Sequence, residues 1–263
     1  MARDTPFLCG LALAAMVLTP AAPLRAEVSG ALATAIAADP AMKDMRRRML
    51  AGKDLSDADL RWLADAGEGL AAARFAERLE GRGDVAVLDD AAHYYSIAVY
   101  VDRDFALPRL ISVLGRSGIE IAPKRLKSIL QVLEGQAQQG SPVAAAGLAG
   151  FYLRGQPFGT DVPRARDLLL VAAEAGDTQA AIRLALSHIQ GAPGLPPDPV
   201  AARPALALAL ASPDPGVQAM ANTLLLRLPK GAPILTAFAP KTATMRPLPR
   251  PTIPVSATEG PTP

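Results

Sequence analysis

Small and apolar residues recur along the chain at the three- and four-residue spacing of amphipathic helices. The clearest run begins with Ala144, Leu148 and Tyr152, each four residues apart, and it breaks at Gly155. A second helical pattern follows, and the first pattern then restarts at Ala180. This segment therefore predicts one helix-turn-helix unit followed by the beginning of its own copy.

The same register recurs along most of the chain. With Ala144 as position zero, equivalent positions lie 35 to 38 residues apart, which is the period range of helical-hairpin solenoids. We predict that positions zero, four and eight form one continuous core, because a single hairpin cannot bury its apolar face alone. The residues at position zero are Ala71, Ala106, Ala144, Ala180 and Val217. Those at position four are Phe75, Leu110, Leu148, Leu184 and Ala221, and those at position eight are Leu79, Leu114, Tyr152, His188 and Leu225.

The second helix of each unit gives an independent test of this register. Fifteen residues before each restart the chain has a small or apolar residue, and eleven residues later it has a turn former. The pairs are Ala91 and Asp102, Ile129 and Gly140, Ala165 and Gly176, and Ala202 and Pro213. The pattern is weakest over residues 104–139, where we expect Pro108 to interrupt a helix and where Gln136 replaces an alanine.

The unit around residues 144–180 resembles the Sel1-like repeat, a relative of the tetratricopeptide repeat. The matching residues are Leu148-Ala149, Phe151-Tyr152, Gly155, Asp161 to Ala165, Ala172-Ala173, Gly176-Asp177 and Ala180. The resemblance implies an all-α, right-handed α-solenoid of about four and a half hairpins over residues 67–228. The chain differs from the cysteine-rich Sel1 proteins because its single cysteine is Cys9. Packing alone is therefore expected to hold the hairpins together.

Residues 1–26 have the pattern of a secretory signal peptide. Arg3 supplies the positive start, and the apolar run over residues 7–18 is too short to span a bilayer comfortably. We expect cleavage after Ala26, with Ala22 as the second choice, and delivery to a bacterial periplasm or to the outside of the cell. An uncleaved anchor helix is the alternative.

Residues 27–66 predict an N-terminal helical cap over the first repeat. Ser56 and Asp59 match a capping box, with Leu55 and Leu60 placed as a hydrophobic staple, and Trp62 lies on the helix that follows. An earlier helix, about residues 41–51, carries three consecutive arginines, Arg46 to Arg48. These arginines fit a docking site for an acidic surface, a protease-sensitive segment or a solvated helix face.

Residues 229–263 have a different composition, with nine prolines and four basic residues against one acid. Such a segment predicts an extended and largely disordered tail. It fits a spacer, a peptide held by a partner or by peptidoglycan, or a tail without function. Over the whole chain, 50% of residues are hydrophobic and only 4% aromatic, which favours close-packed helices, and the net charge of +2 does not indicate a nucleic-acid partner.

The sequence contains few groups that could carry chemistry. The two histidines, His93 and His188, lie on different repeats without the spacing of a metal site. No glycine-rich phosphate loop and no Gly-x-Ser-x-Gly sequence is present. We therefore predict no catalytic residues, no cofactor and no metal, and we assign both histidines to packing.

Arginine occupies the position three residues after the restart in three of five units, at Arg74, Arg109 and Arg183. This position lies at the margin of the packed stripe, and Arg154 lies further along another first helix. Together these four arginines could form a basic ladder that binds carboxylates of a partner. Independent solvated arginines are the alternative interpretation.

We therefore expect a noncatalytic adaptor that binds protein partners in the cell envelope, since repeat arrays present long recognition surfaces. The family resemblance suggests a regulator that restrains a membrane sensor, as in control of exopolysaccharide synthesis. An assembly factor for an envelope or secretion complex is the alternative. A cell-wall or β-lactam-related enzyme is a third possibility, and turnover of a muropeptide would reveal it.

Overall fold

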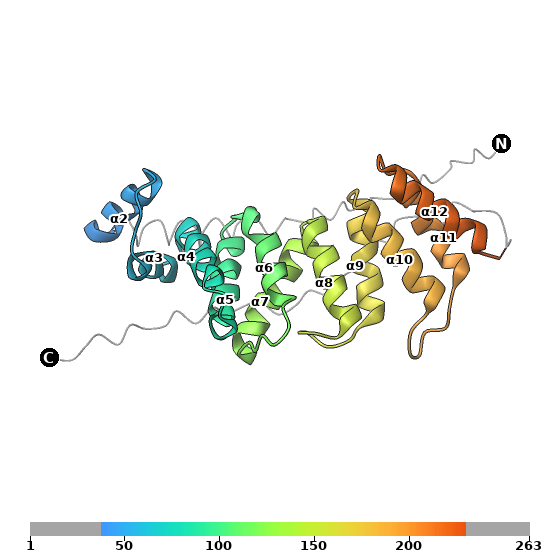
Figure 1. Cartoon of the computed structure of the whole chain (residues 1–263), viewed down its shortest axis with the longest axis horizontal. Coiled ribbons are helices and arrows are strands. Elements are labelled where there is room, and N and C mark those ends of the chain that lie inside the picture. The colour runs from blue at the N-terminus through green and yellow to red at the C-terminus, as the bar shows by residue number, and fades with distance from the viewer. Residues whose placement is uncertain (1–37, 230–263) are drawn as a thin grey trace, which may run out of the picture.

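The computed structural model describes residues 38–229, and this part of the chain is helical throughout, with no β-strand (Figure 1). The predicted signal peptide and the proline-rich tail from residue 230 onward lie outside the described residues. The helices are α2 (Pro40–Leu50), α3 (Asp57–Asp65), α4 (Gly69–Gly81), η1 (Val85–Val87), α5 (Leu88–Tyr100), η2 (Asp104–Ala106), α6 (Leu107–Leu114), α7 (Pro123–Gln138), α8 (Pro142–Arg154), α9 (Val162–Glu174), α10 (Thr178–Gln190), α11 (Pro199–Leu210) and α12 (Pro215–Arg227). None of these helices is long and apolar enough to cross a membrane.

The helices follow one another along a single long axis as a stack of hairpins (Figure 1). The pairs α4–α5, α6–α7, α8–α9 and α10–α11 make four units, and α12 adds a first helix alone. Within three of these pairs, and between each second helix and the first helix after it, the backbones pack closely. The predicted α-solenoid of about four and a half hairpins is confirmed.

The core lies along the line of positions zero, four and eight that the register predicted, which we call the seam. Of the fifteen predicted core residues, all but His188 and Leu225 are buried, and those two are half-buried. The predicted second-helix positions Ala91, Ile129 and Ala165 are also buried. Alanine at so many buried positions lets neighbouring helix backbones approach closely, so the seam is narrow and tolerates little added volume.

The helices begin and end where local chemistry dictates. Asp177 caps α10 by accepting a hydrogen bond from the Ala180 amide at 2.9 Å, and Asp161 and Asp198 cap α9 and α11 in the same way. Side-chain oxygens at these positions satisfy amide groups that have no partner inside the helix. Gly176, at the predicted end of a second helix, has a φ of +96°, which favours glycine.

The second hairpin departs from the expected pattern. Ala106 belongs to the 3₁₀ turn η2, and α6 starts only at Leu107, so Pro108 lies in its first turn and does not interrupt it. Proline is tolerated there because its missing amide would have had no partner. The result is a first helix of only 8 residues. Its partner α7 instead packs on α5 and α8, and Arg125 fixes it to α5 by contacts of 2.8 and 2.7 Å with two aspartates, Asp89 and Asp90.

The N-terminal segment is close to the predicted cap. The Ser56–Asp59 capping box is present at the start of α3, and both staple leucines are buried. The helix α3 also follows the register of the second helices. Leu63 is buried at a register position that is also buried in the second helices, and Gly67, at the position where each second helix ends in a turn, has a φ of +85°. The cap is thus an incomplete hairpin of the same stack. On α2 the three arginines are exposed, which fits a solvated face.

The last helix, α12, carries the features of an array end. The first helices α4, α8 and α10 bury alanine at the position five residues after the restart, as Ala149 and Ala185 show, whereas α12 has the exposed Asn222 there. One residue after the restart, α12 has Gln218, whose amide donates a hydrogen bond to the carbonyl of Ser212 at 2.7 Å. Polar residues on an unpaired outer face keep the end of a repeat array soluble.

Candidate functional site

The four arginines of the predicted ladder each contact a group of this chain. Arg74 donates a hydrogen bond to the Met49 carbonyl at 3.1 Å. The guanidinium groups of Arg109 and Arg183 lie 3.7 Å and 4.0 Å from carboxylate oxygens of Glu80 and Asp177, respectively. The fourth, Arg154, lies over the Phe151 ring at 5.3 Å from its centroid. The structure thus places these side chains beside separate partners, and the ladder stays a prediction.

Gly147 occupies the position at which the other interior units carry arginine. A Cβ atom on this glycine would lie only 2.6 Å from Cδ1 of Ile111 on α6. The position therefore faces the preceding first helix, and α6 and α8 pack tightly at this point. Between Arg109 and Arg183 the row of arginines is interrupted by an apolar contact.

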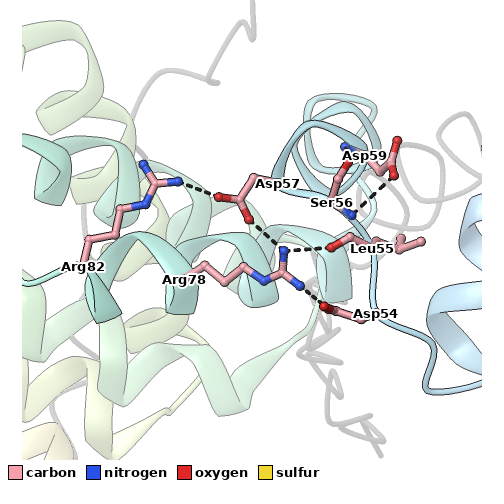
Figure 2. Close-up of polar contacts among 7 residues, drawn as sticks. All are labelled: Asp54, Leu55, Ser56, Asp57, Asp59, Arg78 and Arg82. Carbon is pink, nitrogen blue, oxygen red and sulfur yellow. Dashed lines mark hydrogen bonds and ion pairs between the residues drawn. The ribbon is translucent and has the colours of Figure 1, made fainter.

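A more extensive charged network joins the cap to the first repeat (Figure 2). Arg78 of α4 donates to the Leu55 carbonyl at 2.8 Å and to the Asp57 carboxylate at 2.7 Å, and it also pairs with Asp54. Arg82, the residue that follows the last one of α4, contacts the second oxygen of Asp57 at 2.5 Å. Two arginines from the end of α4 and the residue after it thus hold the turn that precedes α3.

The charges of this network support one another. The hydrogen bond from Arg78 lowers the pKa of the Asp57 carboxyl, and that bond in turn raises the pKa of the Arg78 guanidinium. Opposite charges at hydrogen-bond distance favour both charged forms. The network therefore remains ionised at neutral pH and fixes the position of residues 54–57 against α4.

A pocket of about 410 Å³ opens beside this network, between the cap and α4. Its apolar lining comes from the buried side chains of Leu55 and Leu60. Its polar lining includes Lys53, Arg74 and Glu77, together with the two network residues Asp54 and Arg78. Because Arg74 is held by the backbone of α2 and Arg78 by the turn before α3, the position of both cations depends on the cap.

Cationic donors remain available in this pocket. Within residues 38–229 the Lys53 ammonium has no ion-pair partner, and Arg74 uses one of its five N–H groups in the hydrogen bond to Met49. A lysine and an arginine beside apolar lining residues can bind a carboxylate together with an apolar side chain next to it. Glu77 lines the same pocket, so an incoming group meets charges of both signs.

Two nearly buried glutamates explain where other arginines of the array point. Glu80, with 10% of its side chain exposed, accepts a hydrogen bond from Tyr95 at 2.8 Å and pairs with Arg116. Glu134, with 7% exposed, accepts from Tyr152 at 3.4 Å and pairs with Arg164, which also lies 5.5 Å from the centre of the Tyr152 ring. Each glutamate bridges successive helices, so these charges are part of the packing between repeats.

The two histidines lie apart, as their different repeats predicted. Burial lowers the pKa of both His93 and His188, so both rings are predominantly neutral at neutral pH. The Nδ1 atom of His188 is buried and has no hydrogen-bond partner within residues 38–229. In the same part of the chain no group of three potential metal ligands is found.

Sequence reasoning missed the pocket and its network. The signals were present, because Arg74, Arg78 and Arg82 recur every four residues along α4 and the residue after it, and two aspartates precede α3. The partners are, however, 21 to 25 residues apart in the chain, as in the contacts of Arg78 and Arg82 with Asp57. The hydrophobic period carries no information about such pairing.

Comparisons with known proteins give a limited result. No family model matches the chain, and no curated protein matches it. Among solved structures, a Sel1 repeat protein from Oxalobacter formigenes is found with 22% sequence identity and a TM-score of 0.39. The match covers 64% of this chain and 48% of that chain, so the present chain spans about half the length of that protein. By the period, caps and small-residue seam of its own hairpins, the chain is similar to Sel1-like repeat proteins.

Proposed function

We propose that the array is a noncatalytic protein-interaction module, and that the pocket between the cap and α4 binds a carboxylate-bearing segment of its partner. Lys53 and Arg74 both line that pocket, and this is the observation that carries the proposal. Both cations retain donors, and Leu55 and Leu60 line the pocket beside them. A carboxylate beside an apolar side chain therefore finds complementary groups at one place.

The partner is proposed to be a protein of the bacterial cell envelope. This part rests on the leader-like residues 1–26, which predict export to the periplasm. Within the envelope, a regulator that restrains a membrane sensor is the first form of the proposal, and an assembly factor for an envelope complex is the second. Deletion of the gene separates them, because a regulator changes transcription or polysaccharide output, whereas an assembly factor changes only the amount of a complex.

In-cell crosslinking tests the pocket directly. A photoreactive amino acid replaces Glu77, which lines the pocket, and in a control it replaces the exposed Glu174 on α9. We expect one envelope protein to be captured at position 77 and not at position 174. The reversal Lys53→Glu should abolish that capture while leaving the helical circular dichroism unchanged, because Lys53 has no ion pair within the described residues.

A second comparison separates the pocket from the predicted ladder. Arg183→Glu changes a ladder arginine remote from the pocket, whereas Lys53→Glu changes the pocket alone. If Lys53→Glu weakens binding of the captured partner at least tenfold by calorimetry and Arg183→Glu does not, the pocket is the site. Equal losses would favour the ladder, and unchanged binding in Lys53→Glu would refute the pocket.

A further inference from the structure

A second recognition surface lies at the edge of the array where the first helices begin. The residue one position before the restart is apolar in three successive units, Leu70, Phe105 and Val143, and it is Gln179 and Gly216 in the last two. Phe105 is 57% exposed and Val143 is 44% exposed, while Leu70 is half-buried. We call these three residues the edge stripe.

Neighbouring units pack closely beside the edge stripe. A Cβ atom on Gly69 would lie 2.4 Å from the Val101 side chain, so the turn after α5 packs directly on the start of α4. A pocket of about 370 Å³ lies beside Val143, where α7 ends and α6 begins. Its lining is formed by Asp104, Leu107, Pro108, Gln136, Gln139, Gly140, Ser141 and Val143.

The irregular second hairpin creates this pocket. Other first helices start two residues before the register position, whereas α6 starts one residue after it. Three helical residues are therefore replaced by the 3₁₀ turn η2, which exposes Phe105 and leaves space in front of α8. The Asp104 carboxylate lines this space, and no cation of residues 38–229 is paired with it.

The spacing of the stripe fits a polyproline II helix. The helices α6 and α8 contact each other directly, and packed helices lie about 8–10 Å apart, so Phe105 and Val143 are separated by roughly that distance. A polyproline II helix has three residues per turn and a rise of about 3.1 Å, so one face repeats every ~9 Å. A proline-rich ligand would therefore present one side chain to the unit of α6 and the next to the unit of α8.

The chain contains such a ligand in its own proline-rich segment. At three-residue intervals, Met245, Leu248, Pro251 and Pro254 are all apolar and would form one face of a polyproline II helix. Arg246 and Arg250 flank this face and carry charge opposite to that of Asp104. The segment is also within reach, because residues 230–244 can span about 50 Å when extended. The path from the end of α12 back to the start of α8 crosses four helix contacts and the length of α12, a diagonal of at most about 45 Å.

We propose that residues 245–255 of the same chain bind across the edge stripe, with Leu248 or Pro251 beside Phe105. The proposal does not depend on the pocket at the cap. It assigns the proline-rich segment a binding surface on its own array, and it places an arginine of the segment near Asp104.

Photocrosslinking of the full chain tests this contact. A photoreactive amino acid at position 105 should crosslink to a peptide within residues 245–255, identified by mass spectrometry. The same amino acid at Val200, which is 63% exposed but outside the stripe, should not. Mixing isotopically labelled and unlabelled copies distinguishes a contact within one chain, which we expect, from one between two copies, which would overturn the proposal.

A matched pair of variants tests the register of the bound face. Leu248→Glu places a charge on the apolar face and should reduce the crosslink at least fivefold. Thr252→Glu places the same charge in the same segment but on another face, and the crosslink should be largely retained. Equal effects of the two variants, a crosslink to another segment or another protein, or no crosslink would each overturn the proposal.

Discussion

The register makes a sharp prediction about one pair of positions. Ala185 on α10 and Asn222 on α12 both lie five residues after a restart, but Ala185 is fully buried and Asn222 is exposed. We predict that Ala185→Asn destabilises the array strongly and that Asn222→Ala does not. The two variants exchange the same two residue types in opposite directions, so helix propensity contributes at most about 1.4 kcal/mol to the difference between them.

The magnitude follows from what the buried site must accept. An amide without hydrogen-bond partners costs about 1–3 kcal/mol when it is buried. The added atoms in a close-packed alanine seam cost about 1–3 kcal/mol more. We therefore expect Ala185→Asn to lower the free energy of unfolding by about 3 kcal/mol, which corresponds to a fall of about 6–12 °C in Tm for a chain of this size. For Asn222→Ala we expect a change within about 0.5 kcal/mol.

Urea denaturation followed by circular dichroism measures both variants in the full chain. Because repeat arrays can open locally, hydrogen exchange of the amides in α10 and α11 should accompany it. In Ala185→Asn, exchange should accelerate there more than in α4 and α5. A loss below about 1 kcal/mol, or equal losses in the two variants, would refute the claim that α12 is a polar end of a seam that interior repeats bury.

Three further predictions concern the cap, the seam and the histidines. Arg78→Ala should lower the free energy of unfolding by about 1–2 kcal/mol and expose residues 51–56 to proteolysis, whereas Arg82→Ala, which removes one exposed contact, should cost under about 0.5 kcal/mol. Gly147→Ala should destabilise the chain by about 1–2 kcal/mol in thermal melts because its Cβ would meet Ile111, whereas Gly135→Ala, with open space around it, should stabilise α7 by about 0.5–1 kcal/mol. Since burial lowers the pKa of His188, the stability it contributes is complete above pH 6.5 and falls as the pH drops through the lowered value. His188→Gln should therefore reduce the loss of stability in urea between about pH 7.5 and about pH 5.5.

Local periodicity predicted the seam but not its exceptions. Position zero, as at Ala144 and Ala180, is buried because a helical hairpin repeats the same contact in every unit, and one sequence contains several copies of that signal. The late start of α6 has no such repetition. Pro108 indicated a disturbance, but the period did not predict that a 3₁₀ turn precedes the helix or that Ile111 packs on Gly147 of α8.

The arginines show the same limit. The register predicts Arg74, Arg109 and Arg183 at the margin of the seam, but a margin position touches whichever element comes next. For Arg74 that element is the end of α2, for Arg109 it is the buried Glu80, and Arg183 lies near the cap residue of its own helix. The partner of a long cationic side chain is thus set by tertiary contacts, which a period of 35 to 38 residues does not contain.

Both proposed binding surfaces lie where the repetition fails. A regular hairpin presents the same narrow alanine seam and capped helix ends to every neighbour, so it satisfies its own polar groups and leaves little space. At the cap, the absence of a complete hairpin leaves Lys53 and Arg74 beside a pocket, and at the second hairpin a lost helical turn leaves Phe105 exposed beside another. Replacing either the cap or the irregular start of α6 with regular repeat sequence should therefore raise the free energy of unfolding. It should also remove the binding function at that place without affecting the other.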